Sequence, residues 1–163
     1  TVPSIVFYNL HNCAAVHFIE ADNSSYLCSD RKDSTYIYMK NIAETYWKRK
    51  KMPIPHLLLS DYEGRNVWSH KGIVHWRGMN ICMVTDGYWR NKSATNLLDI
   101  DYMYLCKGYK GEIAPLQKLF HIKRIVLDAS LGDYKLKAYK EECKTLGLDY
   151  IDISEKGSFR ILL

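Results

Sequence analysis

Short apolar runs, separated by glycine, asparagine, aspartate or proline, recur along this chain and limit the folds that it can adopt. Such runs are typical of β-strands, and a run without polar alternation is typical of a strand buried on both faces. Segments 56–59 and 124–127 are of this second kind. The predicted strands are residues 4–10, 15–20, 26–28, 56–59, 67–68, 73–76, 81–84, 102–106, 124–127, 150–153 and 158–163.

Three other segments are predicted to be helices. Residues 36–51 and 133–146 carry apolar side chains at helical spacing, and residues 112–120 form a further helical segment. We expect Asp133 to cap the last helix and Gly147, which tolerates the left-handed conformation, to end it. Because strands and helices alternate at both ends of the chain, we expect two sheets, or one mixed sheet, covered by helices.

Composition is that of an ordinary globular domain. The chain has 163 residues, 47% of them hydrophobic and 25% charged, with a net charge of +5 spread evenly along it. This balance excludes a polybasic tail and permits weak affinity for an anionic polymer. No low-complexity stretch, repeat or linker interrupts the sequence, so we predict a single domain over residues 1–163.

Cysteine spacing and hydropathy exclude two further classes of protein. The five cysteines contain no Cys-x-x-Cys pair, which argues against a disulfide framework or a zinc knuckle and favours buried free thiols. The charge-free segment 1–19 is long enough to span a bilayer, but His11 and His17 are costly in hydrocarbon, so we predict no membrane span. The chain begins at Thr1 and not at methionine, and we expect it to be part of a longer protein.

Several strings follow one another in the order in which a known family has its motifs. They are Asn-Leu-His-Asn-Cys-Ala at 9–14, Tyr-Leu-Cys-Ser-Asp at 26–30, Ser-Asp-Tyr-Glu-Gly-Arg at 60–65, Asp-Tyr-Met-Tyr-Leu-Cys-Lys-Gly-Tyr at 101–109 and Glu-Lys-Gly-Ser-Phe at 155–159. With the elements between them, they resemble the β-lactamase-like domain at the C-terminal end of ComEC-type competence membrane proteins, which take up DNA. The resemblance implies an α+β fold of the αββα type, a metallo-β-lactamase-like two-sheet sandwich that is flanked by helices and truncated.

The metal-ligand motifs of that family are missing from this chain. Metallo-β-lactamase-fold hydrolases use His and Asp side chains at strand ends to hold the metal that makes the hydroxide nucleophile. The family has His-x-His-x-Asp-His where this chain has Asp61 and Glu63 but no histidine, and His-His-Gly where this chain has Cys106-Lys107-Gly108. A lysine repels a metal cation. The resemblance therefore implies a catalytically silent domain without a metal or other cofactor.

The acidic residues leave an enzymatic alternative open. Asp61, Glu63 and Asp128, joined by Asp86 and Asp133, would form an oxygen-rich site for Mg²⁺ or Mn²⁺. Such a site would make the chain a metal-dependent nuclease or phosphodiesterase, which is the activity that the resemblance implies for the intact family domain. The competing interpretation is structural, with Asp128 in a turn at a strand end and Asp133 as a helix cap.

Aromatic and basic residues are neighbours at several points of the chain, as they are on surfaces that bind single-stranded nucleic acid. Trp47 and Trp76 fall on apolar stripes, so we expect both in the core. The loops at 89–92 and 107–110 remain as candidates. The predicted nucleic-acid-binding residues are Trp89, Arg90, Lys92, Lys107, Tyr109 and Lys110.

The resemblance implies a soluble, extramembrane domain of a ComEC-type DNA uptake channel protein, attached through its parent chain to the inner (cytoplasmic) membrane. We expect the domain to lie on the outer, periplasmic side, where it would contact single-stranded DNA or stabilise the channel through the transmembrane region of the parent chain. No small-molecule substrate is indicated. A structural appendage without DNA contact is the remaining alternative.

Overall fold

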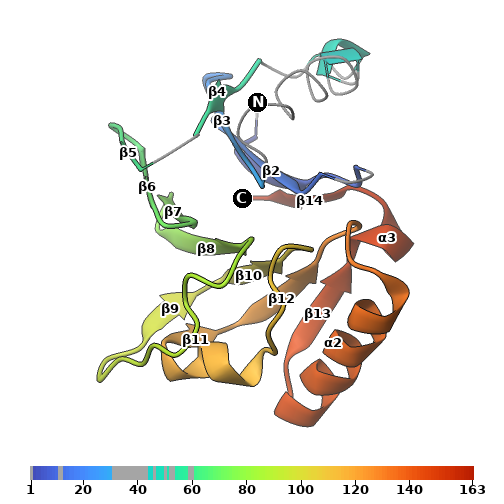
Figure 1. Cartoon of the computed structure of the whole chain (residues 1–163). Helices are drawn as coiled ribbons and strands as arrows, with labels where there is room; N and C mark the ends of the chain where they lie inside the picture. The colour runs from blue at the N-terminus through green and yellow to red at the C-terminus, as the bar shows by residue number, and fades with distance from the viewer. Residues whose placement is uncertain are drawn as a thin grey trace.

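The computed structural model describes residues 2–10, 13–30, 44–45, 47–49, 51, 54–58 and 61–163. Two large sheets pack face to face, and helices lie outside this pair (Figure 1). A third sheet has only two strands. The expected α+β sandwich of two sheets is confirmed at this level.

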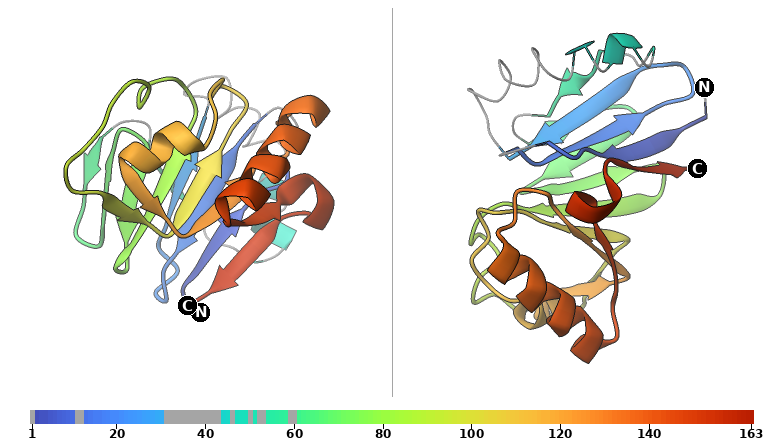
Figure 2. Two further views of the ribbon diagram at one scale, coloured as in Figure 1. Left: turned by 90° about the horizontal axis from the view of Figure 1, so that it is seen from below. Right: turned by 90° about the vertical axis from the view of Figure 1, so that its right-hand side faces the viewer.

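The first sheet has five strands in the order β14-β1-β2-β3-β4. They are β1 (Ser4–Phe7), β2 (Ala15–Ile19), β3 (Ser25–Ser29), β4 (His56–Leu57) and β14 (Phe159–Leu162). The pairs β14–β1, β1–β2 and β2–β3 are antiparallel, and β4 is parallel to β3. The first and last strands of the chain are therefore neighbours, and the two termini lie close together (Figure 2).

The second sheet has seven strands in the order β13-β12-β10-β8-β7-β6-β5. They are β5 (Tyr62–Glu63), β6 (Val67–His70), β7 (Ile73–Trp76), β8 (Met79–Val84), β10 (Tyr102–Leu105), β12 (Arg124–Leu127) and β13 (Asp149–Asp152). Strands β5 to β8 form an antiparallel meander, whereas β8, β10, β12 and β13 are parallel to one another. The carboxyl ends of these four parallel strands consequently meet at one edge of the sheet.

Apolar side chains from both sheets fill the space between them. Phe7 contacts Tyr104 with ring centroids 5.0 Å apart, and Phe18 contacts Trp76 with centroids 5.5 Å apart. Glu20 joins the two sheets with a polar contact, because its carboxylate accepts a hydrogen bond of 2.5 Å from the Trp76 indole N–H. The predicted core position of Trp76 is confirmed.

Further elements cover the outer faces of the two sheets. Helix α2 (Asp133–Leu146), the 3-10 helix η1 (Ala114–Lys118) and the parallel pair β9 (Leu98–Ile100) and β11 (Phe120–Ile122) pack on the second sheet. The short α3 (Ile153–Lys156) leads from β13 to β14. On the outer face of the first sheet, the buried Trp47 donates its indole N–H to Tyr8 Oη at 3.0 Å, as its predicted core position requires.

Segment 56–59 was expected to be a strand buried on both faces, and the structure corrects this. Strand β4 spans only His56–Leu57 and has an exposed His56. Among the described strands, β4 lies at the end of the first sheet and pairs with β3 alone. Leu59 lies outside the described residues. The predicted helix 36–51 also falls largely outside them, although residues 44–45 and 47–49 are helical.

Two helix predictions also need correction. Of the predicted helix 112–120, only residues 114–118 are helical, as the 3-10 helix η1, and Phe120 already belongs to β11, because pairing with β9 replaces helical bonding there. Helix α2 has the predicted bounds and ends at Gly147 in the left-handed conformation, but Gly132 is its N-cap and Asp133 forms no capping hydrogen bond. All five cysteines lie in the described residues, are buried and form no disulfide bond, as predicted.

Candidate functional site

Loops that follow the parallel strands of the second sheet gather at one edge of the sandwich. Residues 85–97 follow β8, and residues 106–113 follow β10. Ligands of open sheets with parallel strands usually bind outside the carboxyl ends of the strands. The six predicted nucleic-acid-binding residues all belong to these two loops.

The loop after β10 packs directly on the loop after β8. A Cβ atom at Gly108 would lie 1.9 Å from the Thr85 carbonyl oxygen, so only glycine permits this approach. Tyr109 is buried, and its hydroxyl donates to the Glu112 carbonyl oxygen at 2.5 Å. These contacts hold Lys107 and Lys110 on a backbone that is tightly packed.

Helix α2 fixes the other side of the same loop. The Glu142 carboxylate accepts hydrogen bonds from the backbone N–H groups of Ile113 (2.7 Å) and Ala114 (2.8 Å) at the start of η1. The Tyr139 hydroxyl donates to the Gly111 carbonyl oxygen at 2.7 Å. Such bonds satisfy backbone groups that the short 3-10 helix cannot pair internally. The end of the loop after β10 is therefore hydrogen-bonded to α2.

Aromatic packing anchors the loop after β8. The half-buried Trp89 ring meets Phe120 edge to face with centroids 5.2 Å apart. Tyr88 meets Trp89 in the same manner at 4.6 Å, and the Tyr88 backbone N–H donates to Asp86 Oδ1 at 2.9 Å. The rings of Trp89 and Tyr109 thus serve packing, and Tyr88 is the aromatic side chain that this loop exposes to solvent, by 39%.

Four cations of the predicted site face solvent at this edge. Arg90, Lys92, Lys107 and Lys110 are exposed, and within the part of the chain that the structure describes none of them forms an ion pair. Burial raises the pKa of the Tyr109 hydroxyl, and the nearby positive charge of Arg90 opposes this rise. Arg90 and Tyr109 belong to different loops, so the two loops lie close together here; we call Arg90, Lys92, Lys107 and Lys110 the basic edge.

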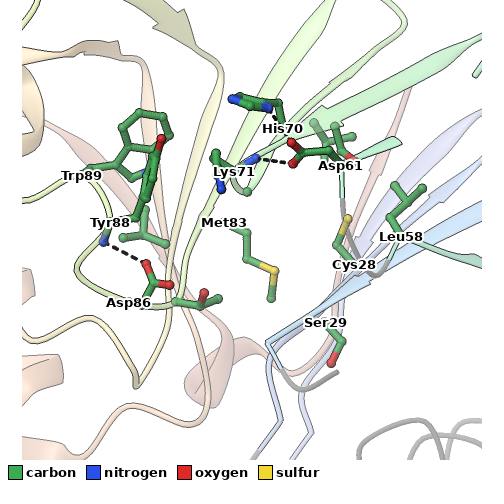
Figure 3. Close-up of a pocket in the computed structure, with 15 residues that line it drawn as sticks. Cys28, Ser29, Leu58, Asp61, His70, Lys71, Met83, Asp86, Tyr88 and Trp89 are labelled. Carbon is green, nitrogen blue, oxygen red and sulfur yellow. Dashed lines mark hydrogen bonds and ion pairs between the residues drawn. The ribbon is translucent and has the colours of Figure 1, made fainter. Parts of the chain in front are cut away.

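A cleft of about 500 Å³ opens beside this edge, between the end of β3 and the β6–β8 part of the second sheet (Figure 3). Tyr88 and Trp89 line one side, Cys28 and Leu58 line the other, and Met83 lies between them. The ammonium groups of Lys71 and Lys92 lie 5.2 Å and 4.6 Å from the centroid of the Tyr88 ring.

Asp61 lines the cleft and is held by two donors. Its carboxylate accepts the Lys71 backbone N–H at 3.1 Å and lies 2.7 Å from Nδ1 of His70. The hydrogen bond from Lys71, supported by His70, lowers the pKa of this exposed carboxyl group below its usual value. Asp61 is therefore ionised at neutral pH.

The other predicted carboxylates do not converge on Asp61, apart from Asp86, which lines the same cleft. Glu63 pairs with Trp68 across β5 and β6, and Asp133 lies on the first turn of α2. Asp128 is buried, accepts hydrogen bonds from the Tyr104 hydroxyl and from the Ser130 backbone N–H (2.9 Å), and has a pKa raised by burial. Among the residues that the structure describes, no group of three or more His, Cys, Asp or Glu side chains is placed to hold a metal ion.

The sequence reasoning missed Tyr88 and Lys71. Tyr88 precedes Trp89 directly and was part of the same aromatic and basic string, so the composition of the loop was the available signal. Lys71 belongs to the β6–β7 turn, and the antiparallel pairing of β7 with β8 brings this turn to the end of β8, within reach of Tyr88.

Comparison with known proteins bears on the resemblance noted in the sequence. A search of curated proteins and a search of solved structures found no significant match. In the described segments, no helix has both the length and the apolar character needed to cross a membrane. The family model described as the ComEC C-terminal domain matches residues 5–163. The chain therefore belongs to the ComEC C-terminal domain family.

Proposed function

We propose that this chain is an extramembrane domain of a DNA uptake protein and that it binds single-stranded DNA without cleaving it. We further propose that its two-sheet sandwich is a metallo-β-lactamase-like fold without the metal-ligand motif. Membership of the ComEC C-terminal domain family supports the DNA uptake context. We place the domain on the periplasmic side of the inner membrane, next to the transmembrane region of its parent chain.

The basic edge is the observation that carries this proposal. Four exposed cations that form no ion pair with any described residue occupy two loops that pack on each other. Arg77, Lys123 and Lys140 are paired with carboxylates at 3.0, 3.2 and 2.7 Å, whereas exposed Arg65 and Lys137 form no ion pair with a described residue. The gathering of four cations on two adjoining loops is therefore what marks this edge. A cation that has no ion-pair partner and lies on a rigid backbone gives up no ion pair and little conformational entropy when it binds a phosphate. The release of counterions then favours binding.

A salt titration of DNA binding tests the proposal. If all four cations contact phosphates, log Kd should change with log salt concentration with a slope of about 3, at roughly 0.7 per contact for a single strand. Arg90→Glu and Lys107→Glu should each weaken binding and lower this slope. Lys123→Glu is the matched control, because Lys123 precedes β12 and so lies at the opposite edge of the second sheet.

Two results would contradict the proposal in different ways. If Arg90→Glu and Lys107→Glu leave a measurable affinity unchanged, the basic edge is not the DNA-binding surface. If the wild-type chain binds no DNA even at low salt, the domain is a structural part of its parent that stabilises the channel without DNA contact.

A metal-dependent nuclease is the second candidate, and the observation in its favour is that Asp61 and Asp86 line one cleft. Labelled single-stranded and duplex DNA should be incubated with the chain and Mg²⁺, Mn²⁺ or Zn²⁺. Cleavage that depends on the metal and disappears in Asp61→Ala would establish the nuclease and overturn catalytic silence. Glu63→Ala serves as the control, because Glu63 lies outside the residues that line the cleft.

A further inference from the structure

Tyr88 has the placement of a stacking platform. Its ring forms one wall of the cleft (Figure 3), and its edge-to-face contact with Trp89, which in turn packs on Phe120, restrains the ring from behind. The bond from the Tyr88 backbone N–H to Asp86 restrains the main chain. A flat ligand that binds such a ring loses less affinity to ordering than one that binds a freely moving side chain.

Positive charge lies beside this ring, because Lys71 also lines the cleft and Lys92 lies next to Tyr88. Lys92 Nζ donates to the Tyr88 carbonyl oxygen at 2.6 Å, and the ammonium groups of Lys71 and Lys92 both lie close to the ring centroid. Neither side chain forms an ion pair with a carboxylate in the described part of the chain. A phosphate group next to a ligand on Tyr88 would therefore meet two ammonium groups.

The lining of the cleft also carries two exposed carboxylates and apolar side chains. The carboxylates of Asp61 and Asp86 lie at the walls, whereas Met83 and Leu58 supply apolar surface (Figure 3). Carboxylates repel a phosphate from the interior but accept hydrogen bonds from the N–H groups of a neutral heterocycle. A ligand with a flat, uncharged ring next to Tyr88 and these carboxylates, and with its phosphates on Lys71 and Lys92, therefore suits this set of groups.

We propose that the cleft binds one unpaired nucleobase of single-stranded DNA, stacked on Tyr88, with the flanking phosphates on Lys71 and Lys92. This inference rests on the proposed function and adds a site that selects single strands. A base in a duplex is paired and stacked, and it reaches a pocket of this kind only after it leaves the helix. Base stacking on an aromatic ring is stronger than an exposed cation–π contact, so the ammonium groups move from the ring to the phosphates.

Binding of two matched oligonucleotides separates stacking from phosphate contact. The probes are labelled deoxythymidine oligonucleotides of about 12 nucleotides, with bases and with abasic sugars throughout, at a fixed salt concentration. We expect the wild-type chain to prefer the oligonucleotide with bases. Tyr88→Leu should weaken this binding by between about 5- and 150-fold and leave abasic binding unchanged. Tyr88→Phe keeps the ring and should retain the preference.

Each outcome of this experiment decides one part of the inference. Equal wild-type affinity for both probes, or an equal loss on both in Tyr88→Leu, overturns the nucleobase site and leaves the basic edge intact. Absence of binding to either probe overturns the proposed function as well. If free thymidine 5′-monophosphate binds as tightly as the oligonucleotide, the cleft is a mononucleotide site and the assignment to DNA is wrong. Circular dichroism of each variant checks its fold.

Discussion

The contact between Glu20 and Trp76 offers a direct test of how the two sheets are held together. Glu20 is 6% exposed and Trp76 is fully buried, and the carboxylate accepts the indole N–H at 2.5 Å and an Arg77 N–H at 3.0 Å. Glu20→Ala removes the acceptor and leaves the indole N–H buried without a partner. A buried donor left in this state costs about 1–3 kcal/mol of folding free energy.

Loss of the Arg77 ion pair adds a smaller cost. The Arg77 side chain is 43% exposed, so solvent screens the pair and its contribution is at most about 1 kcal/mol. The free energy of unfolding of Glu20→Ala should thus be about 1–4 kcal/mol below the wild-type value. Glu155→Ala is the matched control, because Glu155 is 71% exposed and its ion pair with Lys140 is long, at 3.7 Å. We expect a change below about 0.5 kcal/mol there.

Urea denaturation followed by circular dichroism measures these differences. An unchanged slope of the unfolding free energy against urea concentration shows that the compactness of the folded state is preserved. A double-mutant cycle with Trp76→Phe isolates the indole contact, because Phe has no N–H to leave unpaired. The cost of Glu20→Ala should be smaller in the Trp76→Phe background. A cost that is the same in both backgrounds, or a Glu20→Ala variant as stable as the control, would refute the reasoning.

Three further predictions concern buried groups and the loop after β10. Gly108→Ala should displace this loop from Thr85, because a Cβ atom has no room at 1.9 Å from the carbonyl oxygen. We expect lowered thermal stability together with weaker DNA binding. Wild-type values for both would contradict the packing argument. Burial raises the pKa of Asp128, so its contribution to stability is complete below the unfolded-state pKa of about 4 and is lost as pH rises through the folded-state pKa. Unfolding midpoints in urea should therefore fall with rising pH in wild type relative to Asp128→Asn, and parallel curves would exclude this linkage. Burial, with a smaller effect of Arg160, lowers the pKa of His17 to about 3, so its ring resonances should not titrate in NMR spectra between about pH 8 and about pH 5.

The local sequence pattern predicted those elements in which tertiary contacts agree with the intrinsic preference of the residues. Strands β7 and β12 and helix α2 were recognised from apolar runs and helical spacing, because burial of these side chains agrees with their intrinsic preferences. The single turn of α3 and the strands β9 and β11 escaped notice. Strands β9 and β11 are short and lie apart in the chain, and their pairing exists only because the folded chain brings them together.

The same distinction holds for the candidate site, where residue identity determined one part and tertiary packing determined the other. The sequence by itself determined the family resemblance, the absence of the family's histidine motifs and the cations of the two loops, since these depend only on residue identity. Tertiary structure alone decided that Trp89 and Tyr109 support the loops, that Tyr88 is exposed and that Lys71 lies beside it. The physical reason is that exposure and proximity depend on how the sheets and loops pack, and this packing joins residues that are distant in sequence.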